Sequence, residues 1–347
     1  MNNLLIRKSV RTLEAYTPGE QLRRPGLIKL NTNENPYPPS PWVAEALTAL
    51  PLETLRLYPD PVSTGLRQTM ADLHEVKLDQ VFAGNGSDEI LALCTRAFVE
   101  DDGTISYFMP SYSLYPVLAA IRAVPGVACG LTDTFEWPAR DPEPASLFFL
   151  ANPNAPTSML FPKTKVSAFC KRFSGVVLVD EAYVDFARES CMDLAKTMPN
   201  VLVMRTLSKS YSLAGIRCGY VVGPEALISA LFKIKDSYNL NRLTQVAAMA
   251  ALKDQATMRD NAERIKATRD RLSAELERLG FTVCPSEANF LWAKPAGQDA
   301  RVLFEALKAE GILIRHFPGE RTGEYVRITV GTDEDVDRLL QVLGGML

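Results

Sequence analysis

The chain has 347 residues, of which 47% are hydrophobic and 23% charged, as expected for a globular protein with one large domain and a smaller one. Its net charge of −3 gives no electrostatic basis for binding nucleic acid or an anionic membrane. No apolar run approaches membrane-spanning length, and the apolar part of the N-terminus is too short for a signal peptide. We therefore expect a cytoplasmic protein.

The cysteines and histidines exclude several kinds of site. The six cysteines are scattered without a CxxC pair, which predicts reduced thiols rather than a zinc site or a disulfide framework. The two histidines, His74 and His316, are too few for a histidine-based metal centre, and a Ser-His-Asp triad is disfavoured. We expect no metal, and we expect any catalysis to use Lys, Tyr, Asp and Arg.

The first 39 residues are rich in Asn and Pro, and this composition predicts an extended N-terminal arm. From residue 40 to 241, short apolar runs alternate with helical patterns, and Ser40 followed by Pro41 is a typical helix start. This alternation predicts an α/β fold with a mostly parallel sheet covered by helices on both faces. The expected strands are 104–108, 146–150, 176–179, 201–204 and 220–222, and the expected helices include 63–74, 90–98, 114–121 and 163–173.

The pattern changes after residue 241. Two helices, at 243–252 and 259–279, are followed by strands that alternate with further helices. The expected strands are 290–293, 312–315 and 325–330, and the expected helices are 301–310 and 334–343. We interpret residues 242–347 as a smaller α+β domain.

The segment from Thr206 to Arg217 carries the strongest chemical signal. Its single lysine, Lys209, follows an apolar strand, and a desolvated lysine can form a Schiff base with a carbonyl. Ser208 and Arg217 supply a hydroxyl and a forked cation that suit a phosphate. Pyridoxal 5'-phosphate (PLP) combines an aldehyde with a phosphate. An isolated Ser-Lys pair is more often an ordinary surface loop, so this interpretation depends on the rest of the chain.

Three other segments follow expected strands or precede expected helices, at the sheet edge where open α/β folds bind ligands. The turn 84–88, Gly-Asn-Gly-Ser-Asp, leads into a helix whose first amides can hold a phosphate. The loop 152–157, Asn-Pro-Asn-Ala-Pro-Thr, is made rigid by its prolines. Asp180 ends a strand with a carboxylate, and if buried it needs a partner such as a protonated ring nitrogen.

Together these segments resemble the fold type I PLP enzymes, and most closely the histidinol-phosphate aminotransferase branch of aminotransferases. The resemblance covers nearly the whole chain, because the matching segments occur in the order and approximate spacing of that family. They are 30–37, 58–60, 86–89, 152–157, 180–183, the Ser208-Lys209 loop and 326–331.

The resemblance implies a role for each matching residue. It makes Lys209 the Schiff-base lysine and proton carrier, and Asp180 the partner of the pyridinium nitrogen. Tyr183 and the Asn154 loop are expected at the phenolic oxygen of the ring, and Tyr112 on the ring face. The residues expected around the cofactor phosphate are Gly86, Ser87, Asp88, Ser208 and Arg217. Tyr58 is expected to reach the cofactor of the neighbouring subunit, which implies a homodimer with shared active sites.

The chain departs from the family pattern in the proline loop. Ala155 stands where many members carry Asn, and Ser158 stands where they carry Gly. Whether Asn152 or Asn154 faces the ring is therefore left open by the sequence.

Two arginines lie in short apolar strands, where a charge requires a partner. Arg327 resembles the family arginine that holds the acidic end of the substrate, and Arg315 resembles the second anion-binding arginine. Tyr16 and Asn33 resemble substrate-contacting residues of the arm. The two arginines and the arm tyrosine favour a phosphorylated amine as substrate. The resemblance implies transamination between histidinol phosphate, a small amino donor, and 2-oxoglutarate, a 2-oxo acid, in histidine biosynthesis.

Several alternatives share parts of this pattern. An aromatic amino acid aminotransferase and a threonine-phosphate decarboxylase would use the same lysine, phosphate site and anion-binding arginines. A non-enzymatic sensor of PLP or nucleotide is disfavoured because it needs no residue such as Arg327 to hold a substrate. An NAD-dependent dehydrogenase is disfavoured because no GxGxxG motif follows the first strand.

Overall fold

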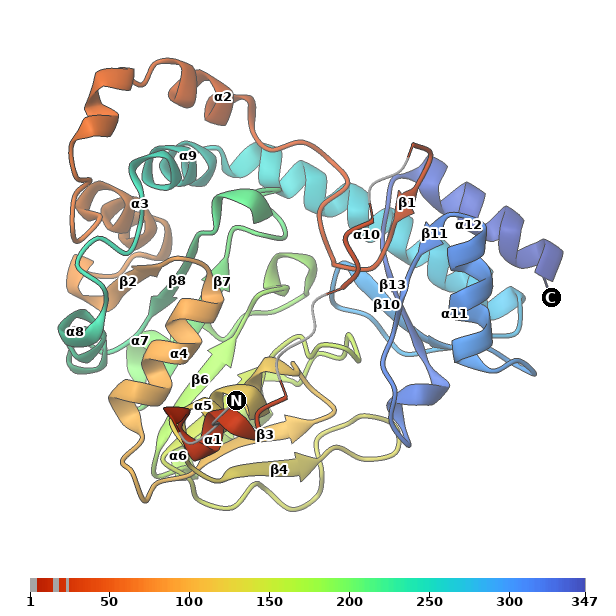
Figure 1. Cartoon of the computed structure of the whole chain (residues 1–347), viewed down its shortest axis with the longest axis horizontal. Coiled ribbons are helices and arrows are strands. Elements are labelled where there is room, and N and C mark those ends of the chain that lie inside the picture. The colour runs from red at the N-terminus through yellow and green to blue at the C-terminus, as the bar shows by residue number, and fades with distance from the viewer. Residues whose placement is uncertain (1–4, 15–18, 23–24, 347) are drawn as a thin grey trace.

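The computed structural model describes residues 5–14, 19–22 and 25–346, so Tyr16 lies outside the described residues (Figure 1). A seven-stranded sheet forms the centre of the molecule. In spatial order its strands are β2 (Val81–Gly84), β8 (Gly219–Val222), β7 (Val201–Thr206), β6 (Val176–Asp180), β5 (Leu147–Ala151), β3 (Ile105–Met109) and β4 (Gly126–Gly130). Strand β8 runs antiparallel to both of its neighbours, and the other neighbouring pairs are parallel. The mostly parallel sheet predicted from the sequence is confirmed.

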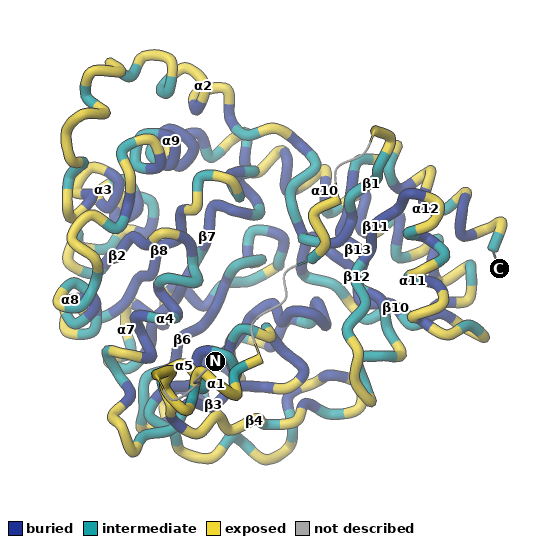
Figure 2. The backbone as a smooth tube through the Cα atoms, in the orientation of Figure 1, coloured by how far each residue is buried: buried dark blue, intermediate teal, exposed yellow. Residues whose placement is uncertain are grey.

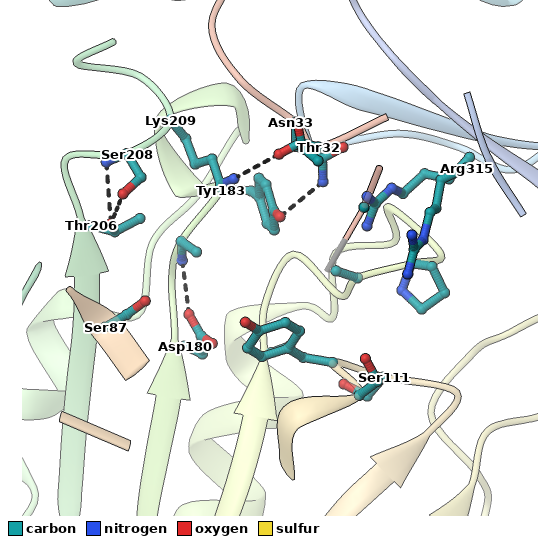
Figure 3. A pocket seen from close by; sticks show the side chains of 18 of the residues that line it. Thr32, Asn33, Ser87, Ser111, Asp180, Tyr183, Thr206, Ser208, Lys209 and Arg315 are labelled. Carbon is teal, nitrogen blue, oxygen red and sulfur yellow. Dashed lines mark hydrogen bonds between the residues drawn. The ribbon is translucent and has the colours of Figure 1, made fainter. Parts of the chain in front are cut away.

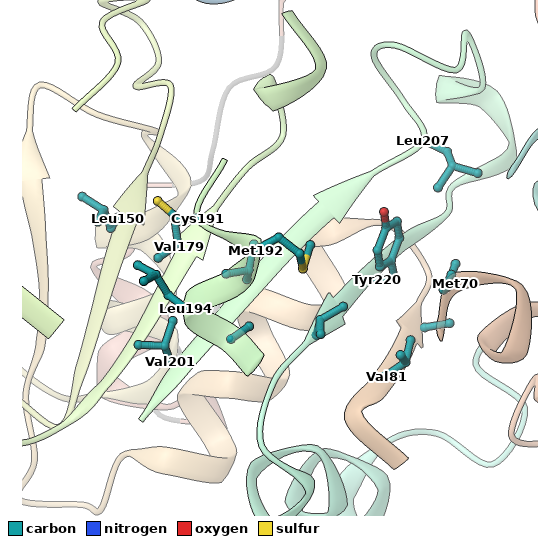
Figure 4. Packing of buried hydrophobic residues seen from close by; sticks show 14 of the residues in the cluster. Met70, Val81, Leu150, Val179, Cys191, Met192, Leu194, Val201, Leu207 and Tyr220 are labelled. Atoms are coloured by element: carbon teal, nitrogen blue, oxygen red, sulfur yellow. The ribbon is translucent and has the colours of Figure 1, made fainter. Parts of the chain in front are cut away.

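The strands of this sheet contribute alternate residues to two hydrophobic cores, one on each face. In β6, Val177 and Val179 belong to one core and Leu178 to the other. This is the expected result of the two-residue period of a strand that is covered on both sides. Figure 4 shows the first core, where Val179 and Val201 pack near Leu194.

Helices cover both faces of the large sheet. Over the first core lie α2 (Pro41–Thr48), α3 (Thr64–His74), α6 (Lys163–Arg172), α7 (Met192–Thr197) and α9 (Arg242–Lys253). Over the second core lie α4 (Ser87–Phe98), α5 (Leu114–Arg122) and α8 (Glu225–Ile234). Because both faces are covered, the loops at the ends of the strands are the part of this sheet left to line a site.

The second sheet is four-stranded and antiparallel, and Figure 1 shows it beside the large one. Its strands, in spatial order, are β12 (Arg315–His316), β13 (Val326–Thr329), β10 (Phe290–Lys294) and β9 (Thr282–Val283). It has its own core, to which α10 (Gln255–Arg278), α11 (Ala300–Ala309) and α12 (Asp333–Met346) contribute leucines. The sequence boundaries at residues 39 and 241 stay predictions.

The described part of the N-terminal arm is mostly irregular, but it includes α1 (Lys8–Arg11) and β1 (Ile28–Lys29). Strand β1 pairs in parallel with β11 (Ile312–Leu313), and this pairing fastens the arm to the smaller sheet. As a result, residues 31–33 of the arm come to lie against β13, where they close one side of the site described below.

The structure differs from the sequence expectations in several elements. Strands β2 and β4 and helices α7 and α8 were not expected. Strand β4 is an edge strand built from small residues that are mostly exposed, so it lacks the apolar run of a buried strand. Helix α10 begins at Gln255 rather than near residue 259, because the Asp254 side chain caps it by accepting a hydrogen bond from the amide of Thr257.

Candidate active site

A cavity lies at the carboxyl ends of β5, β6 and β7, and the arm and strands β12 and β13 close its other side (Figure 3). Ligands bind at this edge of open α/β sheets because the strand ends and helix starts meet there. The structure brings most of the predicted site residues together around this cavity. They are Asn33, Ser87, Asp88, Tyr112, Asp180, Tyr183, Ser208, Lys209, Arg217, Arg315 and Arg327.

Lys209 lies on the loop after β7. The side-chain amide of Asn35 donates to the carbonyls of Lys209 and Ser210, at 3.1 Å each, and so holds the loop. The Lys209 Nζ donates to the backbone carbonyl of Thr32 at 3.2 Å, as Figure 3 shows. Desolvation by the cavity wall, and then the charge of Arg327, lowers the pKa of Lys209 to about 8. The amine therefore loses its proton more readily than an exposed lysine does.

Asp180 is the last residue of β6 and is only 7% exposed. Its carboxylate accepts hydrogen bonds from the Tyr115 hydroxyl at 2.9 Å and from the backbone amide of Ala182 at 3.1 Å. Burial raises the pKa of Asp180 to about 6. Across the described residues, no lysine or arginine forms an ion pair with Asp180. The cavity thus presents a buried carboxylate to any cationic group of a ligand.

An anion-binding corner lies where α4 begins. Gly86 precedes the helix with a φ of +82°, a conformation that favours glycine. A Cβ at this position would also lie only 2.5 Å from Nη2 of Arg217, so a larger residue would clash. The Thr206 hydroxyl contacts the Ser208 hydroxyl at 3.0 Å and fixes its position. The first amides of α4, the Ser208 hydroxyl and the Arg217 guanidinium are together a set of donors suited to a phosphate.

The other side of the cavity is formed by aromatic and cationic side chains. The Tyr183 hydroxyl accepts a hydrogen bond from Nδ2 of Asn33 at 2.9 Å. The Tyr112 hydroxyl donates to Asp88 at 3.3 Å. Arg315 and Arg327 are direct cross-strand partners on β12 and β13.

Phe317 is a cavity residue that the sequence reasoning missed. Its ring centroid lies 5.3 Å from the guanidinium carbon of Arg315 and 5.2 Å from that of Arg327. The available signal was its position two residues after Arg315, because alternate residues of an extended segment face the same side. Phe317 provides an aromatic surface that both cations contact.

Asn154 is not among the residues that line the cavity, and the expectation that its amide faces a bound ring stays a prediction. Its Nδ2 donates to the carbonyl of Pro110 at 3.0 Å and to the Thr157 hydroxyl at 2.8 Å, and its Oδ1 accepts from Ser111 at 2.7 Å. Asn152 is engaged within the wall as well, where its Nδ2 donates to the carbonyl of Phe161. Ala155, which stands where many family members carry Asn, does line the cavity.

Tyr58 also lies away from the cavity of its own chain. It is 76% exposed, and its ring stacks on Tyr238 with centroids 4.3 Å apart. Gly86 lies behind the cavity wall, against Arg217.

The residues of the cavity fit PLP as a set. A lysine amine suits its aldehyde, a buried carboxylate suits a protonated ring nitrogen, and the start of α4 with Ser208 and Arg217 suits its phosphate. The fold and the cavity therefore define an enzyme of the α/β class whose chemistry depends on such a cofactor.

The family model for class I and II aminotransferases matches residues 25–343, and the chain belongs to this family. Its relatives include the histidinol-phosphate aminotransferase of Synechocystis sp., which is 46% identical over 98% of both chains. The enzyme of the same name from Chromohalobacter salexigens is 45% identical over 96% of this chain and 97% of its own. These alignments set aside the sensor and dehydrogenase alternatives.

Solved structures agree with this assignment. The histidinol-phosphate aminotransferase of Sinorhizobium meliloti, determined in complex with pyridoxal 5'-phosphate, has a TM-score of 0.84 and 26% identity, and the alignment covers 92% of each chain. An L-threonine-O-3-phosphate decarboxylase from Porphyromonas gingivalis also matches, with a TM-score of 0.82 and 21% identity, a likeness that extends to the fold alone. Within the described ranges, none of the helices is both long and apolar enough to span a bilayer.

Proposed function

We propose that the chain is a PLP-dependent aminotransferase that exchanges an amino group between histidinol phosphate and 2-oxoglutarate, a reaction of histidine biosynthesis. The relatives cited above carry this activity in their names. The structural observation that supports the phosphorylated substrate is the cross-strand pair Arg315 and Arg327, which lines the cavity. Two guanidinium groups on neighbouring strands supply planar, forked donors of the kind that pair with phosphate and carboxylate oxygens.

In this proposal, each residue around the cofactor has a defined task. Bound PLP supplies the carbonyl that takes up the amino group and a ring that accepts electron density from the substrate Cα. Asp180 holds the ring nitrogen in its protonated form. Lys209 moves the proton to and from the substrate Cα through its Nζ. A pKa of about 8 keeps part of the Lys209 population neutral near pH 7 to 8, as a base requires.

The remaining residues bind and orient. The start of α4, Ser208 and Arg217 hold the cofactor phosphate, and Tyr112 covers one ring face. For the substrate, Arg315 holds the distal phosphate of histidinol phosphate, and Arg327 holds the α-carboxylate of glutamate or 2-oxoglutarate. Phe317 contacts both guanidinium groups and gives the imidazole an apolar surface.

We further propose that two copies of the chain form a homodimer with shared active sites. An exposed apolar surface supports this part of the proposal, since contiguous exposed apolar patches mark protein contacts. Leu55, Leu57, Tyr58 and Leu243 line one surface hollow, and the Tyr58 ring stacks on Tyr238; all five side chains are exposed. Tyr58 lies in this surface and outside its own cavity, as a residue serving the partner's cavity would.

A cytoplasmic location is supported by the cysteines, because all six are unpaired.

A panel of amino donors tests the substrate. Purified protein loaded with PLP is assayed with 2-oxoglutarate and either histidinol phosphate, phenylalanine, tyrosine or threonine phosphate. We expect the highest kcat/KM for histidinol phosphate. A higher value for phenylalanine or tyrosine would favour an aromatic amino acid aminotransferase. Release of CO2 from threonine phosphate would favour the decarboxylase.

A further inference from the structure

Asn33 connects the smaller sheet to Tyr183 through a chain of hydrogen bonds. Its backbone amide donates to the Thr329 hydroxyl at 3.0 Å, and that hydroxyl donates to Oδ1 of Asn33 at 2.9 Å. Nδ2 of Asn33 then donates to the Tyr183 hydroxyl at 2.9 Å, as Figure 3 shows. Thr329 lies on β13 and Tyr183 follows β6, so the chain of hydrogen bonds joins the two sheets across the cavity.

The direction of these hydrogen bonds is fixed by proton counting. The Thr329 oxygen accepts the Asn33 amide proton, so its own single proton is available for Oδ1 of Asn33. With Oδ1 bound there, the other end of the amide is the NH2 group, which can only donate to Tyr183. The Tyr183 oxygen is therefore an acceptor on this side, and its own proton is free to point into the cavity that the residue lines.

The surroundings of Asn33 and Tyr183 hold this arrangement in place. Asn33 is buried with a φ of +56°, and its carbonyl accepts from Nδ2 of Asn289 at 3.1 Å. The Tyr183 ring packs edge-on against Phe290 at 4.9 Å between centroids. Burial raises the pKa of the Tyr183 hydroxyl, so it keeps its proton at neutral pH. Ala155 packs in the same cluster and offers a methyl group in place of a donor.

We propose that Asn33 and Thr329 are positioning residues that orient the Tyr183 hydroxyl as a proton donor to the phenolic oxygen of the bound cofactor ring. The inference rests on the proposed function, because it requires PLP in the cavity. It gives Asn33 a task in addition to the substrate contact expected from the sequence, because its Nδ2 already donates to Tyr183 and its Oδ1 accepts from Thr329.

The visible absorption of bound PLP reports this hydrogen bond. A donor to the phenolic oxygen stabilises negative charge there, so the protonated form of the chromophore releases its proton at lower pH. Loss of the donor raises the pKa of the chromophore. One hydrogen bond to a charged oxygen corresponds to about one pKa unit, a tenfold change in the proton dissociation constant.

Two substitutions at Asn33 keep its backbone conformation, because Gly and Asp both tolerate a positive φ. Asn33→Asp keeps the shape of the side chain but replaces the NH2 donor with an acceptor, which draws the Tyr183 proton away from the cavity. We expect its chromophore pKa to rise by about one unit, comparable to the rise in Tyr183→Phe. Asn33→Gly removes the donor without adding a charge, and we expect a smaller rise.

Thr329 supplies a matched pair of variants in case the Asn33 variants fold poorly. Thr329→Val keeps the shape but loses the hydroxyl, and we expect the chromophore pKa to rise. Thr329→Ser retains the hydroxyl and should keep the original pKa. Thermal unfolding of each loaded variant identifies any loss of structure.

The Tyr183→Phe background separates positioning from other effects. There, Asn33→Gly and Thr329→Val should leave the chromophore pKa unchanged, because the hydroxyl they orient is absent. An equal shift with and without the hydroxyl would overturn the inference, and so would an unchanged pKa in all Asn33 and Thr329 variants that carry Tyr183. If the unmutated protein gave no visible band with PLP, the proposed function itself would be wrong.

Discussion

Lys209 lies between charges of opposite sign, and the balance among them determines its pKa. Arg327 lowers this pKa and Glu34 raises it, in addition to the larger effect of desolvation. We expect Arg327→Gln to raise the pKa of Lys209 above about 8 and Glu34→Gln to lower it. The pH dependence of the rate at which cofactor-free protein combines with PLP measures this pKa.

The PLP-loaded protein from this experiment can also be used to identify the lysine that reacts with PLP. Borohydride reduction followed by peptide mapping should place the pyridoxyl label on Lys209, and Lys209→Ala should bind PLP only loosely and remain unlabelled at that peptide. Label on a different lysine would contradict the assignment. Shifts of the same sign in Arg327→Gln and Glu34→Gln would show that conformational changes, and not these charges, control the pKa.

Asp180 makes the cofactor-free protein sensitive to pH. Its folded-state pKa of about 6 lies above the ordinary value of 3.8, so its contribution to stability is full below about pH 4 and is lost as the pH rises through 6. The shift of about two units corresponds to about 3 kcal/mol of unfolding free energy at pH 7. We expect Asp180→Asn to stabilise the cofactor-free protein at pH 7 by up to this amount, while it weakens PLP binding and slows Cα proton transfer.

Urea denaturation of both cofactor-free proteins from pH 4 to 8 measures this effect. The difference in unfolding free energy should grow between pH 4 and 6 and then level off, because the amide side chain of the Asp180→Asn variant does not titrate. A difference in unfolding free energy that is independent of pH would mean that the pKa of Asp180 is not raised in the folded protein. A normal single-turnover rate in the loaded variant would remove Asp180 from the mechanism.

At the scale of elements, β12 and β13 set the spacing of the two arginines. We expect Arg315→Ala to lower kcat/KM for histidinol phosphate by more than tenfold, since truncation of one partner of a buried charge-assisted contact costs about 2–5 kcal/mol. Arg315→Lys keeps the charge without the planar fork and should lose less. Steady-state kinetics with histidinol phosphate and with phenylalanine measure the difference. Equal losses on the two donors would make Arg315 structural and favour the aromatic aminotransferase.

The elements also show how far the sequence can predict the site. Strands β5, β6 and β7 are buried on both faces and appear in the sequence as continuous apolar runs, so the positions of Asp180 and Lys209 at their ends follow directly. The register that places Arg315 opposite Arg327 does not follow, because it depends on pairing between separate segments.

Orientation of side chains within a loop is equally beyond the sequence. The sequence does not show which side chains of the three consecutive residues Pro153, Asn154 and Ala155 point into the cavity. The tertiary contacts of Asn154 with Pro110 and Ser111 turn it into the wall, while Ala155 reaches the cavity. Edge strand β4 was missed for a related reason, since its stability comes from pairing with β3 rather than from an apolar run of its own.

At the scale of the whole molecule, the proposed dimer makes each active site depend on two chains. In a mixed population of Tyr58→Phe and Lys209→Ala proteins, a heterodimer carries one site with both residues intact, while each homodimer carries two altered sites. After dissociation and reassociation of the mixture, we expect each heterodimer to have up to half of the activity of an unmutated dimer. Activity and PLP affinity of the mixture, compared with each parent, measure the recovery.

The design depends on Tyr58→Phe having a measurable defect of its own, and the phosphate contact expected of its hydroxyl predicts weaker PLP binding. Tyr238→Phe is a matched control, because Tyr238 stacks on Tyr58 in the same exposed surface. Its hydroxyl has no proposed contact with the cofactor, so PLP affinity should be unchanged. Sedimentation of the protein as a fully active monomer at assay concentration would refute shared active sites, because Tyr58 does not reach the cavity of its own chain.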